Sequence, residues 1–85
     1  TGQSKGVMLS QMNAAFNALG AVSELNIRDS DVWLHVAPIF HLVDAWAIWA
    51  VTWSGGKHVF LPQFKPQAVM ETIEREKVTM TALVP

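Results

Sequence analysis

Apolar residues change their spacing several times along the chain, and each change marks an expected element. A short apolar run at residues 7–9 predicts a strand. Apolar residues then recur at three- and four-residue steps, which predicts a helix with Ser10 as its N-cap that ends near Leu25. The expected buried face of this helix is Met12, Ala15, Phe16, Leu19 and Val22.

The middle of the chain combines continuous apolar runs with turn residues. The expected elements are a buried strand at 32–37, a helix at 44–53 and a strand at 58–61. Pro38 ends the strand at 32–37, and Gly55 and Gly56 end the helix at 44–53, as glycine commonly does. Three tryptophans at helical spacing, Trp46, Trp49 and Trp53, predict a core-facing stripe.

The last third of the chain repeats the alternation. Pro66 suits the first turn of a helix whose buried face would hold Val69, Met70 and Ile73, and residues 78–84 predict a final strand. Alternating strands and helices predict an α/β fold with a mostly parallel layered sheet. Ligands gather at the carboxyl ends of such strands, so residues 38–41 are a candidate site.

The composition and charge of the chain limit the kinds of partner that it is expected to bind. The 85 residues are 51% apolar, more than so small a domain can readily cover, so we expect an apolar contact with the remainder of the same polypeptide. The net charge of −1 gives no electrostatic case for a nucleic acid partner.

A transmembrane segment and a metal site are not expected either. The uninterrupted apolar part of residues 36–53 begins only at Ala45, so it is too short for a transmembrane segment, which needs roughly 20 residues. There is no cysteine, and no histidine pair has metal-ligand spacing, so we expect no metal site within this chain alone.

The first six residues carry the clearest chemistry. Two glycines, two hydroxyl residues and Lys5 precede the apolar run. Glycine lets the backbone approach an anion closely, and backbone N–H groups, hydroxyls and a lysine supply donors and charge. The predicted phosphate-binding residues are Thr1, Gly2, Ser4, Lys5 and Gly6. A P-loop is excluded, because lysine precedes glycine here and no hydroxyl follows.

Three segments together resemble the acyl-adenylate-forming (AMP-binding) enzyme family. Residues 1–10 resemble the second half of its AMP-binding signature, and residues 37–41, Ala-Pro-Ile-Phe-His, resemble its next core motif. Residues 64–66 and 77–85 resemble the segment that leads to the acid-binding pocket. The resemblance covers the whole chain. It implies that residues 1–85 form a partial AMP-binding domain. This part begins inside the phosphate-binding loop and ends before the acid-pocket and adenine motifs.

The resemblance implies an acyl-CoA synthetase, similar to 4-coumarate-CoA ligases. Such enzymes use ATP and Mg²⁺ to convert a carboxylic acid to an acyl-adenylate, which then forms a thioester with coenzyme A. The resemblance places Lys5 and its neighbours at the ATP phosphates, and His41 and Phe40 beside the substrate.

The resemblance also implies that the substrate is a fatty or aryl acid and that the protein is intracellular, either cytoplasmic or peroxisomal. It implies no catalytic residue within these 85, so the isolated chain is expected to be inactive.

Several residues depart from the family pattern or have an ordinary structural interpretation. Ser4 stands where proline is common, and Gln11 replaces a frequent histidine. Asp44 stands where many members have glycine, and we interpret it as the N-cap of the helix at 44–53. His35 and His58 lie within predicted strands and are interpreted as structural.

Two alternatives stay open. One is another adenylate former, either the amino-acid-activating domain of a peptide synthetase or a luciferase-like enzyme. The other is a non-enzymatic, truncated α/β segment that binds partners through an exposed apolar face. Solution behaviour separates the second from the first, because an independent module would be monomeric and unfold cooperatively.

Overall fold

The computed structural model describes residues 2–85 and contains three helices and three strands within that range. In chain order the elements are α1 (Gln11–Leu25), β1 (Val32–His35), α2 (Leu42–Ser54), β2 (Lys57–Phe60), α3 (Pro66–Glu76) and β3 (Met80–Thr81). Helices and strands alternate from α1 onward, as the sequence predicts.

The strands form a parallel sheet in the order β2-β1-β3, which confirms the predicted α/β class. In the register of the central strand β1, Trp33 lies opposite His58 and Leu34 lies opposite both Val59 and Thr81. Parallel strands are normally covered on both faces, which explains the nearly continuous apolar run of β1.

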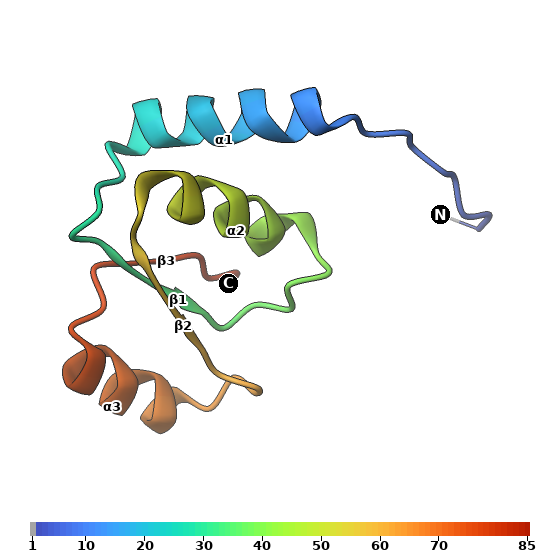
Figure 1. Ribbon diagram of the computed structural model, residues 1–85. Coiled ribbons are helices and arrows are strands. Elements are labelled where there is room, and N and C mark those ends of the chain that lie inside the picture. Colours follow the sequence, from blue (N-terminus) through green and yellow to red (C-terminus); the bar gives the residue numbers. More distant parts are fainter. Residues whose placement is uncertain (1) are drawn as a thin grey trace.

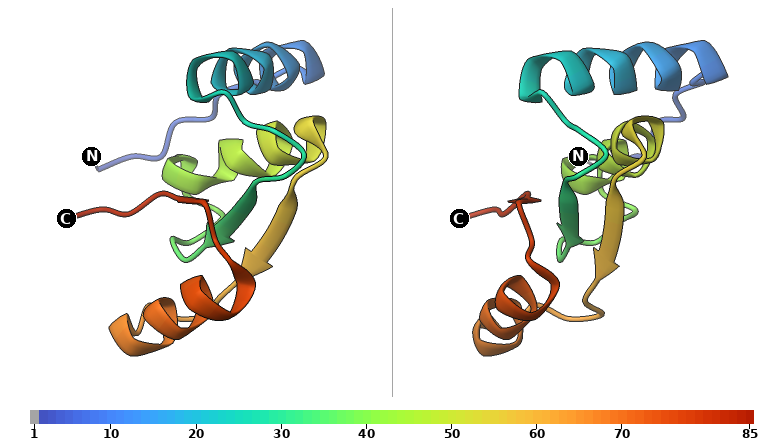
Figure 2. Two further views of the ribbon diagram at one scale, coloured as in Figure 1. Left: turned by 90° about the vertical axis from the view of Figure 1, so that its left-hand side faces the viewer. Right: turned by 60° about the vertical axis from the view of Figure 1, so that its left-hand side comes forward.

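Helices cover the two faces of the sheet (Figure 1). Helix α2 packs on one face, α3 lies beneath the other, and α1 lies across the outer side of α2, as the turned views also show (Figure 2). The core is divided accordingly. Trp33 packs with Ala47 and Val51 on the α2 side, whereas Leu34 packs with Val69 on the α3 side.

The helix ends predicted at Ser10, Gly55 and Pro66 are confirmed. Ser10 caps α1, accepting the Asn13 N–H at 3.1 Å, and the Asn13 side chain accepts the Ser10 N–H at 2.9 Å. Gly55 ends α2 with a φ of 77°, a left-handed conformation that favours glycine. Pro66 occupies the first turn of α3.

The strands predicted at 32–37 and 58–61 differ from β1 and β2 by one or two residues, whereas two other predicted strands differ more. Residues 7–9 form no strand but an exposed extended segment, because no neighbouring strand pairs with them in the described range. The last strand is limited to Met80–Thr81 instead of residues 78–84, because only these two residues pair with β1.

Several predicted buried faces are also wrong. On α1 the small residue Ala18 is buried and faces α2, whereas Met12 and Phe16 are exposed. Trp49 and Trp53 are 60% and 59% exposed, so the tryptophan stripe is not a core stripe in this chain. Trp46 does pack, edge to face on Trp33 with ring centroids 5.2 Å apart. On α3, Val69 is buried but Met70 is exposed. Periodicity identifies an apolar face but does not show which face meets a partner.

Two glycines should respond to alanine in opposite directions. A Cβ at Gly56 would lie 3.0 Å from both the Asp31 carbonyl oxygen and Val51 Cγ1, and that carbonyl already accepts the Lys57 N–H. Gly56→Ala should therefore lower the free energy of unfolding by about 1–3 kcal/mol. A Cβ at Gly20, in the middle of α1, meets nothing within 4 Å, so Gly20→Ala should raise it by about 0.5–1 kcal/mol. Urea unfolding of both variants checks the pair, and a stabilising Gly56→Ala would contradict the packing.

No helix within residues 2–85 is long and apolar enough to cross a membrane.

Candidate functional site

Four of the predicted phosphate-binding residues lie on an exposed segment that projects beyond the start of α1, namely Gly2, Ser4, Lys5 and Gly6 (Figure 1). Thr1 lies outside the described residues. Gly2 has a φ of 101°, a conformation that favours glycine, whereas Gly6 does not have a positive φ. The backbone N–H groups of residues 3–9 have no backbone partner within the described range, so they are available as donors. The role of Gly2, Ser4, Lys5 and Gly6 at a phosphate stays a prediction.

The second predicted site is the turn that joins β1 to α2. The Pro38 carbonyl accepts the His41 N–H at 2.9 Å, which closes the turn. His41 is the N-cap of α2, and its Nδ1 accepts the Val43 N–H at 3.2 Å. In a neutral ring Nε2 then carries the proton, so His41 can donate one hydrogen bond to a ligand.

A hollow of about 290 Å³ lies beside this turn. Its walls come from the turn, from the segment before α3 and from the residues after β3. They are Val36, Ala37, Pro38, His41, Val43, Phe64, Ala82, Leu83 and Val84. The structure therefore brings together the second and third segments of the predicted site around one largely apolar space.

The structure separates Phe40 from His41. Phe40 is 89% exposed and does not line this hollow. It lies instead at a neighbouring depression that Phe60 and Phe64 also line. A substrate role for Phe40 and His41 stays a prediction.

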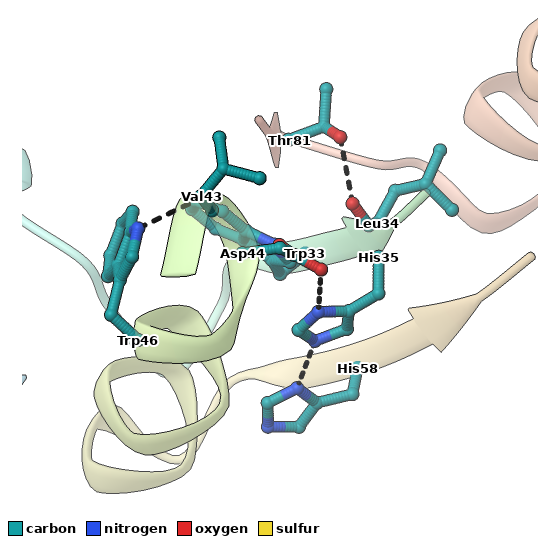
Figure 3. A network of polar contacts seen from close by, with 8 residues as sticks. All are labelled: Trp33, Leu34, His35, Val43, Asp44, Trp46, His58 and Thr81. Carbon is teal, nitrogen blue, oxygen red and sulfur yellow. Dashed lines mark hydrogen bonds and ion pairs between the residues drawn. The ribbon is translucent and has the colours of Figure 1, made fainter. Parts of the chain in front are cut away.

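The prediction for Asp44 is wrong. Helix α2 begins at Leu42, with His41 as its N-cap, so Asp44 lies within the first turn. Its side chain is fully buried and points toward the sheet (Figure 3). Oδ1 accepts the Trp33 Nε1–H at 3.0 Å, and Oδ2 lies 2.8 Å from His35 Nδ1.

The hydrogen bonds continue from Asp44 across the sheet. His35 Nε2 lies 2.8 Å from His58 Nδ1, and the two ring planes differ by 14° (Figure 3). His58 Nε2 in turn lies 2.9 Å from Thr52 Oγ1, near the end of α2. The network thus runs beneath α2 from its first turn to its last, with a buried end at Asp44 and an exposed end at Thr52.

Sequence reasoning missed this network. The period of two along a strand places Trp33 and His35 on one face, which is a signal available from the sequence. Periodicity does not predict the strand register that brings His58 beside His35. It also does not predict the early start of α2, which turns Asp44 inward.

His58 should make stability depend on pH. Burial, and then the nearby His35, lower the pKa of His58, and the charge of Asp44 opposes part of this shift. The unfolded chain therefore takes up a proton in the usual histidine range, around pH 6.5, before the folded chain does. Stability should fall as the pH drops through this range, until the lowered folded pKa is reached. Urea unfolding at neutral and mildly acidic pH should show a smaller loss in His58→Gln than in the wild type. Equal losses would assign the dependence to other groups.

No group of three or more His, Cys, Asp or Glu side chains gathers at metal-binding distance among residues 2–85.

Comparison with known proteins shows the family to which the chain belongs. The family model described as AMP-binding enzyme matches residues 1–85, and the chain belongs to this family. A long-chain-fatty-acid–CoA ligase from Thermus thermophilus is 38% identical over 89 residues, which span 100% of this chain and 16% of that protein. A 2-succinylbenzoate–CoA ligase from Arabidopsis thaliana is 28% identical over 85 residues, 100% of this chain and 15% of that protein.

Solved structures agree on the fold. The o-succinylbenzoate CoA synthetase from Bacillus subtilis in complex with ATP and magnesium is 31% identical and superposes with a TM-score of 0.85, over 91% of this chain and 21% of that one. A double mutant of the same enzyme, bound to a product analogue, gives a TM-score of 0.87 at 32% identity, over 95% of this chain and 17% of that one. The present chain thus spans only a fraction of the length of the proteins it matches.

Proposed function

We propose that this chain forms part of the large N-terminal domain of an ATP-dependent acyl-CoA synthetase. In the first step a carboxylate oxygen of the substrate attacks the α-phosphorus of ATP, and the bond from that phosphorus to the bridging oxygen breaks, which releases pyrophosphate. In the second step the thiol of coenzyme A gives up its proton to solvent, the thiolate sulfur attacks the acyl carbon, and AMP leaves with the electrons of the broken C–O bond. The remainder of the polypeptide supplies the rest of both binding sites.

One observation carries this proposal beyond family membership. The hollow at the carboxyl end of β1 is lined by the turn with His41 and by the residues after β3, the two segments that the family places near the acid. Its walls are mainly apolar, with the His41 ring as a polar group. Such a space suits the hydrocarbon part of a fatty or aryl acid, and His41 Nε2–H suits a carboxylate oxygen.

The N-terminal segment fits the phosphates of a nucleotide. A Cβ at Gly2 or Gly6 would meet nothing within 4 Å, so a ligand can approach the backbone there, and Ser4 and Lys5 are exposed. These donors would stabilise the charge of the departing pyrophosphate. Mg²⁺ is usually held through substrate phosphates and waters, and it would share this charge when bound.

The test is ATP–pyrophosphate exchange by the enzyme that contains this chain, with panels of fatty, aryl and amino acids. We expect exchange with fatty or aryl acids and formation of the corresponding CoA thioester. Exchange with amino acids alone would favour the peptide-synthetase alternative, and no exchange with any acid would refute the proposal. The 85-residue chain by itself should give no exchange.

A further inference from the structure

We propose that Asp44 is a positioning residue for the acid site, which it serves by tying the first turn of α2 to β1 on either side of the turn that carries His41. The inference rests on the proposed function for its link to substrate, and on the geometry alone for its link to the turn.

The side chain of Asp44 joins two elements. The carboxyl group is fully buried, and within residues 2–85 it bonds only to side chains of β1, through Trp33 Nε1 and His35 Nδ1 (Figure 3). Because each oxygen has its own donor, the two bonds restrain both the position and the rotation of the carboxyl group. Helix α2 cannot slide along the sheet without breaking one of them.

The backbone of Asp44 holds the turn from the same side. Its N–H donates to the His41 carbonyl oxygen at 3.1 Å, while its side chain holds His35, the last residue of β1. Five residues, 36–40, separate His35 from His41. The turn is therefore fixed at both ends by one residue, and His41 keeps its place on the wall of the hollow.

The charge of Asp44 also orients the histidines. An ionised carboxylate only accepts, so His35 donates from Nδ1 and its Nε2 accepts the Nδ1–H of His58, whose Nε2 accepts the Thr52 hydroxyl. An asparagine can keep the Trp33 bond through its oxygen and donate to His35 Nδ1. This reverses the direction of the histidine bonds while it keeps every contact.

A buried carboxylate in this place is not the simplest way to stabilise the fold. Well-packed apolar residues often stabilise a core as well as buried polar pairs do, whereas removal of one partner is costly. Directional bonds instead select one arrangement of α2 on β1, which is what a substrate-binding turn requires.

The test compares Asp44→Ala, Asp44→Asn and Val69→Ala in the enzyme that contains this chain. We expect Asp44→Ala to raise the KM for the acid by about tenfold or more while the KM for ATP stays unchanged, because the turn moves but the phosphate loop does not. Asp44→Asn should retain most of the affinity for the acid. Val69→Ala destabilises the opposite face of the sheet, toward α3, and should change neither KM.

Hydrogen exchange of the segment 37–45 gives a second readout that needs no activity. Asp44→Ala should exchange faster there than the wild type, and Asp44→Asn and Val69→Ala should not. If the wild type activates no acid, the proposed function fails, and the exchange result still decides whether Asp44 holds the turn.

Either of two results would overturn the inference: equal changes in both KM values for Asp44→Ala, or unchanged exchange of the 37–45 segment. Should Asp44→Ala fail to fold, Trp33→Phe removes one of the two donors and keeps a large ring. It should give a smaller shift in the same direction, and a Trp33→Phe enzyme with wild-type KM and exchange would count against the role.

Discussion

Replacement of Lys5 by alanine is expected to lower kcat/KM for ATP by about 100-fold in the enzyme that contains this chain, as loss of a preorganised charge donor typically does. Lys5 is exposed on a segment whose glycines let a ligand approach the backbone. Its ammonium group would offset the negative charge that builds up on pyrophosphate as it leaves. ATP–pyrophosphate exchange at a saturating acid concentration measures the effect.

The matched control for Lys5 is Arg75→Ala. Arg75 is an exposed cation on α3, with a long 3.5 Å contact to Glu76, and it lies outside the N-terminal segment. Its removal should leave the exchange rate unchanged. A Lys5→Ala enzyme with wild-type kinetics would show that Lys5 is an ordinary solvated lysine and that the phosphates are bound by other groups.

Replacement of Leu34 by alanine should lower the free energy of unfolding by about 3–5 kcal/mol, through lost apolar burial and the cavity that remains. Leu34 has no exposed surface and lies in the central strand, where it packs with Val36 and Val69. Whole domains are stable by only about 5–15 kcal/mol, so this change should markedly reduce the folded population. Denaturant unfolding and soluble yield measure the loss.

Met70→Ala is the control for Leu34. Met70 is a large apolar residue on α3 next to the buried Val69, but it is 69% exposed. Its truncation in the 85-residue chain should change the unfolding free energy by less than about 0.5 kcal/mol. A loss as large as that of Leu34→Ala would show that the outer face of α3 is covered.

The errors in the predicted faces have one physical source. Apolar periodicity reports where a helix has an apolar side. It predicted α1, the start of α3 and, to within two residues, both ends of α2. It cannot report which partner meets that side. Phe16, Trp49 and Met70 are all exposed in residues 2–85, although each fits a helical apolar pattern. We interpret these faces as contacts with the remainder of the polypeptide.

The sequence by itself determined the type and order of most elements, the helix ends at Ser10, Gly55 and Pro66, and the family. These depend on residues within about four positions of one another or on short motifs. Only the tertiary structure decided that Asp44 is buried against Trp33 and His35, and that His58 extends the same network. The reason is separation along the chain: Asp44 lies 9 residues from His35, and His58 lies 23 residues from it. Such pairs meet only when strand register and helix packing bring them together.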